Sequence, residues 1–177
     1  EVYEAVYSAS MIEELGQGTY NTILSSCLEY QACISTIHHL PYTGTFLHYR
    51  GSMLNWCPIG RSANLDQRSL WIKADSHHKI RDHFHRLLVR DISNAGIPVT
   101  IALGGSTSFD IYPDGWDKTY VTKHLPGYGI TFVGDKCTGT GNDKTLYELL
   151  QPTDSYETRS PSMTIELINS IIKKALA

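Results

Sequence analysis

A chain of 177 residues with 41% hydrophobic and 19% charged residues has an ordinary globular composition, enough for one domain or two small ones. Its net charge of -3 gives no broad cationic field, which argues against nucleic acid or an anionic membrane as a partner. Any anion site must therefore come from a local cluster. The four cysteines form no CxxC pair and the eight histidines show no metal-ligand spacing, so reduced thiols and solvated histidines are expected.

The first part of the chain predicts helices alternating with pairs of strands. After a lead-in at residues 1–10, the apolar spacing and the turn residues predict a helical stretch at 11–37, strands at 45–50 and 53–58, a helix at 76–94 with Ser76 as its N-cap, and strands at 98–103 and 106–112. This order favours an α+β domain at 11–113, with an antiparallel sheet and helices on one face.

The pattern changes in the second part, which we assign to residues 114–177. Its expected elements are a short helix at 116–125, a buried-type strand at 130–133, a glycine-rich loop at 134–143, a helix at 144–150 and a last helix from Pro161 to about Leu176. Strand, Gly-Asp loop and helix are the alternation of an α/β sheet. The strand has almost nothing to pair with in the sequence, so we expect an incomplete α/β core.

Polar residues in the first part point to phosphate and sugar binding. Arg50, Arg61 and Arg68 cluster around the first strand pair, and converging guanidinium groups hold phosphate through paired N–H donors. Three solvated arginines would fit the same spacing. Ser108 and Asp110 share one strand face and could bind sugar hydroxyls, or could simply be polar residues on the wet face of a sheet.

The second part offers a cation site. Asp135 follows Gly134 directly after the apolar strand, and a carboxylate at a strand end suits Mg²⁺. Asp143 could hydrogen-bond the ligands of that ion and hold them in place without binding the ion itself. Lys118 could neutralise the negative charge of a phosphoryl group during its transfer. Each has an ordinary alternative, because glycine-acidic turns and surface lysines are common.

Six short motifs follow one another along the chain: RGSMLN at 50–55, PIGRS at 58–62, SFD at 108–110, PDGWDK at 113–118, GDK at 134–136 and GND at 141–143. Together they resemble the eukaryotic phosphomannomutase family of the haloacid-dehalogenase superfamily. The resemblance runs from about Leu15 to the C-terminus. It implies that the α+β domain is a cap and that the second part belongs to a haloacid-dehalogenase-like core.

The resemblance also implies roles for the candidate residues. Arg50, Arg61 and Arg68 would bind phosphate, Ser108 and Asp110 would contact substrate, Lys118 would be the catalytic lysine, and Asp135 would bind Mg²⁺. The family interconverts mannose 6-phosphate and mannose 1-phosphate for GDP-mannose synthesis. A cytoplasmic homodimer formed through the cap is the implied state.

Two departures from the family pattern lead to a second hypothesis. The sequence contains no DxDGT motif, which in the family carries the nucleophile and the acid/base, so we expect the chain as given to be inactive alone. Leu149 stands where an acidic residue of a second cation site belongs. The alternative is a catalytically inactive relative that serves as a structural subunit with other proteins, and its expected location is then mitochondrial after presequence removal.

Overall fold

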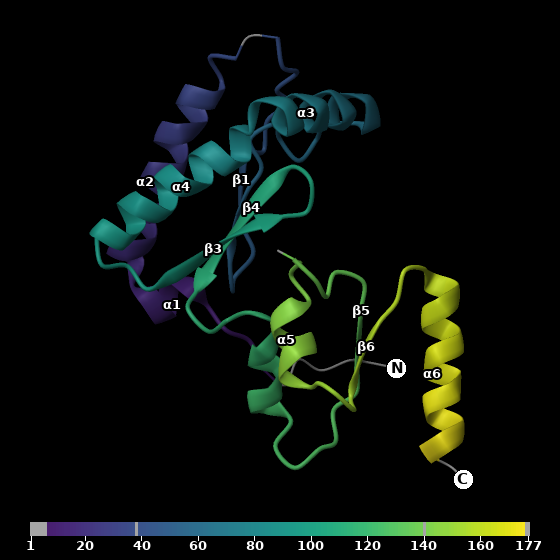
Figure 1. Cartoon of the computed structure of the whole chain (residues 1–177). Coiled ribbons are helices and arrows are strands. Elements are labelled where there is room, and N and C mark those ends of the chain that lie inside the picture. The colour runs from purple at the N-terminus through teal and green to yellow at the C-terminus, as the bar shows by residue number, and fades with distance from the viewer. Residues whose placement is uncertain (1–6, 38, 140, 176–177) are drawn as a thin grey trace, which may run out of the picture. The chain divides into compact units, whose positions relative to one another are not determined.

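The computed structural model describes residues 7–37, 39–139 and 141–175, which form two compact units, Glu1–Asp114 and Gly115–Ala177 (Figure 1). The division falls beside the predicted domain boundary at 113–114. Among the described residues, no helix is both long and apolar enough to cross a membrane.

The first unit contains a four-stranded antiparallel sheet in the order β1-β2-β4-β3. Its strands are β1 (Leu47–Tyr49), β2 (Leu54–Trp56), β3 (Val99–Gly104) and β4 (Ser108–Pro113). Alternation sends Trp56 and Phe109 to one face, where their rings stack with centroids 4.5 Å apart. The opposite face carries Asn55, Ser108 and Asp110. Both predicted strand pairs are confirmed.

Helices cover the apolar face of this sheet (Figure 1). They are α1 (Met11–Leu15), α2 (Gln17–Ile34), α3 (Leu65–His78) and α4 (Ile80–Asn94). Buried Ile23, Cys27 and Ile34 of α2 join the core, and Trp56 Nε1 donates to Gln31 Oε1 of the same helix over 2.8 Å. Gly16, at φ 82, separates α1 from α2 within the predicted helical stretch. The α+β class is therefore confirmed.

The prediction of one helix from Ser76 to Asn94 is wrong at its start. Ser76 lies inside α3, and α4 begins at Ile80 after Lys79, whose φ of 54 breaks the helical path. The N-terminus of α3 is fixed by a capping box between Asn64 and Gln67. Sequence periodicity misses α3 because its apolar residues form no buried stripe: Leu65 is 85% exposed, whereas Trp71 is fully buried.

The second unit combines a parallel strand pair with short helices. Its elements are a 3₁₀ helix η1 (Lys118–His124), β5 (Phe132–Gly134), α5 (Lys144–Leu149), β6 (Ser155–Glu157) and α6 (Pro161–Ala175). The expectation that β5 has almost nothing to pair with is wrong, because β6 pairs with it in parallel, Gly134 opposite Glu157. The strand β6 is short and polar, so no hydrophobic pattern announces it.

The last helix, α6, is present as predicted. Three of the four isoleucines in the expected stripe are exposed, Ile165 at 61%, Ile168 at 42% and Ile172 at 49%, and Ile171 is half-buried. The helix is thus defined by its own periodicity rather than by burial against the described residues.

Candidate functional site

Three polar residues form a continuous hydrogen-bonded chain on the sheet face away from the helices. Asn55 of β2 lies directly opposite Asp110 of β4. The Nδ2 of Asn55 donates to Asp110 Oδ1 over 2.7 Å, and its Oδ1 accepts from Arg61 Nη1 over 2.9 Å. The structure thus brings Arg61 and Asp110, both predicted, to one place through a residue that sequence reasoning did not select.

Arg68 is fixed at the same end of the sheet. From α3 it donates through Nε to Ala63 O (3.0 Å), through Nη1 to Thr107 Oγ1 (3.2 Å) and through Nη2 to Arg61 O (3.1 Å). The Thr107 side chain is buried directly before β4. These bonds use three of the five N–H donors of the guanidinium, so two have no partner among the described residues and can reach a ligand.

Ser108 lies on the same face of β4 as Asp110, whereas Arg50 makes no hydrogen bond to this cluster. The Ser108 hydroxyl donates to Gly104 O over 2.9 Å, which leaves its oxygen able to accept. The backbone N–H of Arg50 donates to Met53 O over 2.8 Å at the far end of the strand pair. Its side chain is exposed and makes no hydrogen bond or ion pair with the described residues.

A buried ion pair braces the turn between β3 and β4. Arg81 Nε donates to Asp75 Oδ2 over 2.7 Å, with both side chains less than 15% exposed. Arg81 Nη1 also donates to Gly105 O over 3.1 Å. Because a buried guanidinium needs partners for its donors, this arrangement holds the backbone next to Ser108 in one conformation.

In the second unit, Lys118 and Asp143 form an ion pair. The Asp143 side chain is only 3% exposed. Its Oδ1 accepts from Lys118 Nζ, and its Oδ2 accepts from the backbone N–H groups of Asp135 and Lys136, each over 3.0 Å. Asp143 therefore holds Lys118 and the loop after β5 at the same time.

The electrostatics of Asp143 follow from these contacts. Burial alone would raise its pKa, but the hydrogen bond from Lys118 and those from the loop backbone outweigh burial and lower the pKa below the ordinary aspartate value. The carboxylate stays charged at neutral pH. Gly134 makes room for it, since a Cβ there would lie 2.8 Å from Asp143 Oδ2.

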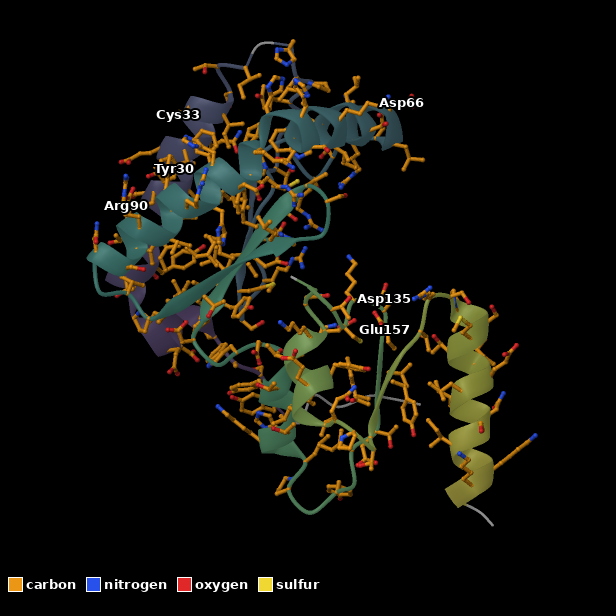
Figure 2. The ribbon with its side chains drawn as sticks, in the orientation of Figure 1. Tyr30, Cys33, Asp66, Arg90, Asp135 and Glu157 are labelled. Atoms are coloured by element: carbon orange, nitrogen blue, oxygen red, sulfur yellow. The ribbon has the colours of Figure 1, made fainter. Side chains whose placement is uncertain are left out.

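The residues present fit a magnesium ion at the end of β5. Asp135 is exposed directly after this strand, while both oxygens of Asp143 are already engaged. Figure 2 shows Asp135 and Glu157 at the same end of the strand pair, where Gly134 pairs with Glu157. Among the residues described, no group of three or more His, Cys, Asp or Glu could enclose a metal. Mg²⁺ commonly needs only one or two carboxylates, with water and phosphate completing its shell.

Several supporting residues escaped sequence reasoning. Asn55 stands within the RGSMLN motif, where alternation does place it on the face of Ser108 and Asp110 once the sheet register is known. Thr107 directly precedes Ser108. No sequence pattern marks Glu157 as part of the site, because only its pairing with Gly134 places it at the end of β5.

Both units have the architecture of a known class of protein. An antiparallel sheet covered by helices on one face, followed by a parallel strand pair with a Gly-Asp loop, is a mixed α+β arrangement that matches a haloacid-dehalogenase cap and part of its core. The family profile described as eukaryotic phosphomannomutase matches residues 2–174. The chain therefore belongs to the eukaryotic phosphomannomutase family, and through it to the haloacid-dehalogenase superfamily, as the motifs predicted.

Individual relatives agree with this assignment. The chain is similar to the phosphomannomutase of Saccharomyces cerevisiae, 36% identical over 167 residues, which is 93% of this chain and 63% of the relative. It is 32% identical to that of Drosophila melanogaster over 168 residues, 93% of this chain and 64% of the relative. It is 34% identical to the phosphomannomutase of Schizosaccharomyces pombe over 169 residues, which is 93% of this chain and 63% of the relative. The chain thus spans a little under two thirds of the length of these relatives.

Proposed function

We propose that the first unit binds a mannose phosphate and serves a phosphomannomutase, which interconverts mannose 6-phosphate and mannose 1-phosphate for GDP-mannose synthesis. The observation that carries the proposal is the joint fixation of Arg61 and Arg68 beside Ser108 and Asp110. The Arg68 guanidinium is bonded to the Arg61 backbone carbonyl and the Arg61 guanidinium to Asn55, and two guanidinium groups fixed in this way suit the oxygens of a phosphate monoester.

The polar residues divide naturally between the two parts of such a ligand. Arg61 and Arg68 would take the phosphate, and Arg50, at the far end of the strand pair, is the third arginine that we propose for this role. Asp110 would repel phosphate, but its Oδ2 can accept from a sugar hydroxyl, and the Ser108 oxygen can do the same. A hexose phosphate offers both groups on one small molecule.

The second unit would supply the charge needed at the reacting phosphoryl group. Asp135 would hold Mg²⁺, which when bound neutralises negative charge on phosphate oxygens. Lys118, oriented by Asp143, would present an ammonium group to the same phosphoryl oxygens. We propose in addition that the protein is cytoplasmic and that it forms a homodimer joined through the first unit. Light scattering in solution would test the dimer by measuring its mass.

Calorimetry with mannose 1-phosphate tests the binding step. We expect the unchanged chain to bind, free mannose to bind far more weakly, and Arg61→Ala to weaken binding by about 10- to 100-fold. Arg86→Ala is the matched control, because Arg86 is an exposed arginine of α4 in the same unit. Equal binding by the Arg61→Ala and Arg86→Ala variants would contradict the assignment of the phosphate site.

Turnover is a separate question from binding. The protein isolated at its natural length should convert mannose 1-phosphate to mannose 6-phosphate in the presence of Mg²⁺ and lose this activity with chelator. Binding without turnover would retain the sugar-phosphate site and refute the mutase activity.

A further inference from the structure

Asn55 is the most deeply buried polar residue of the candidate site in the first unit. It is 2% exposed and lies at the middle of β2, between His48 of β1 and Asp110 of β4 in the sheet register. Its Nδ2 donates to Asp110 Oδ1 (2.7 Å) and to Phe109 O (3.3 Å), while its Oδ1 accepts from Arg61 (2.9 Å). Both ends of the amide are thus in use.

A neutral amide at this point has a specific electrostatic consequence. Arginine and carboxylate side chains that lie close together tend to pair directly, through two parallel hydrogen bonds. Asn55 instead satisfies one nitrogen of Arg61 and one oxygen of Asp110. Within the part of the chain that the structure describes, the other N–H groups of Arg61 and the second oxygen of Asp110 have no hydrogen-bond partner and can take a ligand.

We propose that Asn55 is a positioning residue that couples the phosphate-binding Arg61 to the hydroxyl-binding Asp110. It sets the spacing between the two halves of the ligand site and prevents them from neutralising each other. This role rests on the proposed function of Arg61 and Asp110 in binding a sugar phosphate.

A purely structural role for Asn55 predicts a different outcome. A buried asparagine that only satisfies the sheet would affect stability, and its removal would add independently to the effect of any arginine variant. A positioning role predicts that the effects of Asn55 and Arg61 on binding are not additive. Arg50 provides the comparison, because the hydrogen bonds of Asn55 among the described residues do not include its side chain.

The experiment is a pair of double-mutant cycles, with mannose 1-phosphate binding to the full chain measured by calorimetry. Asn55→Leu should weaken binding by about 10-fold or more. In that background Arg61→Ala should weaken binding by less than about threefold further, whereas Arg50→Ala should retain its full effect. Asn169→Leu, at an exposed asparagine of α6, should leave binding unchanged.

Thermal unfolding of each variant shows whether it is folded. If Asn55→Leu does not fold, the same cycles are run with Asn55→Ser, which removes the amide without adding bulk. Additive effects of the Asn55 and Arg61 changes, or unchanged binding by the Asn55 variant, would overturn the coupling role and leave the proposed function standing. Absence of mannose 1-phosphate binding by the unchanged chain would overturn both.

Discussion

The carboxylate of Asp110 occupies the space that a side chain on Gly104 would need. A Cβ built on Gly104 would lie 2.6 Å from Asp110 Oδ2 and 2.8 Å from its Cγ. The two residues are on the adjacent strands β3 and β4. Gly104 does not adopt a left-handed backbone conformation. The glycine is therefore required for space beside the carboxylate and not for backbone freedom.

Gly104→Ala should consequently affect the site more than the fold. The added methyl group must push the Asp110 carboxylate aside, which we expect to weaken mannose 1-phosphate binding by about 10-fold. The free energy of unfolding should change by less than about 1 kcal/mol, since only a side-chain end has to move. Calorimetry and urea unfolding measure the two quantities.

Gly18→Ala is the matched control for this substitution. Gly18 lies in α2, and a Cβ there would meet nothing within 4 Å. This variant should keep its binding and gain up to about 1 kcal/mol of stability from helix propensity. Unchanged binding by Gly104→Ala would show that the position of the Asp110 carboxylate does not matter to the ligand.

Thr107 is expected to orient Arg68. Its hydroxyl accepts from Arg68 Nη1 over 3.2 Å, and valine has nearly the same shape without the oxygen. Thr107→Val should weaken mannose 1-phosphate binding by about three- to tenfold, because one of three bonds that hold the guanidinium is lost. Thr22→Val, at an exposed threonine of α2, is the control. Equal affinities of the two variants would show that Arg68 is positioned without Thr107.

The sequence predicted most of the residues that we propose as ligand contacts and few of those that hold them. Arg61, Arg68, Ser108 and Asp110 have chemistry that suggests a ligand wherever they occur. Asn55 acquires its role only when β2 and β4 pair with Asn55 opposite Asp110, a relation between residues 55 positions apart. Local patterns carry no information about such a register.

The fold was predictable where burial imposes a period on the sequence. The strands of the four-stranded sheet and the helices α2 and α4 have such periods, whereas α6 shows the period without burial against the described residues. Helix α3 has none, although the Asn64–Gln67 capping box was available as a local signal for its start. Strand β6 has only three residues and no hydrophobic pattern. It forms a strand because it pairs with β5, so it is recognised only from the tertiary structure.

The capping box of α3 should contribute measurably to stability. Asn64 Oδ1 accepts from the Gln67 backbone N–H, and Gln67 Oε1 accepts from the Asn64 N–H, each over 2.9 Å. Asn64→Ala should lower the free energy of unfolding by about 1 kcal/mol. Ser69→Ala, in the same helix and exposed, should instead raise it slightly through helix propensity. Urea unfolding distinguishes the signs, and equal changes in both variants would contradict the role of the cap.

The ion pair between Asp143 and Lys118 makes the second unit sensitive to acid. The pKa of Asp143 is lower in the folded state than the ordinary value of about 3.9 expected in the unfolded chain. A carboxylate whose pKa is lowered by folding stabilises the folded state at pH values above its pKa in the unfolded chain. The contribution is lost as the pH falls through the folded pKa. The unchanged chain should therefore lose stability in the second unit below about pH 4.

Asp143→Asn should remove this acid dependence and lower stability at neutral pH, by about 2 kcal/mol for the loss of a charged hydrogen-bond acceptor. Hydrogen exchange followed by mass spectrometry, on peptides that cover β5 and α5 at several pH values, reports the change locally. Asp154→Asn alters an exposed aspartate of the same unit and should preserve the acid response of the unchanged chain. If the Asp143→Asn variant showed the same loss of protection in acid, the carboxylate of Asp143 would not be the group that holds Lys118 and the loop after β5 together.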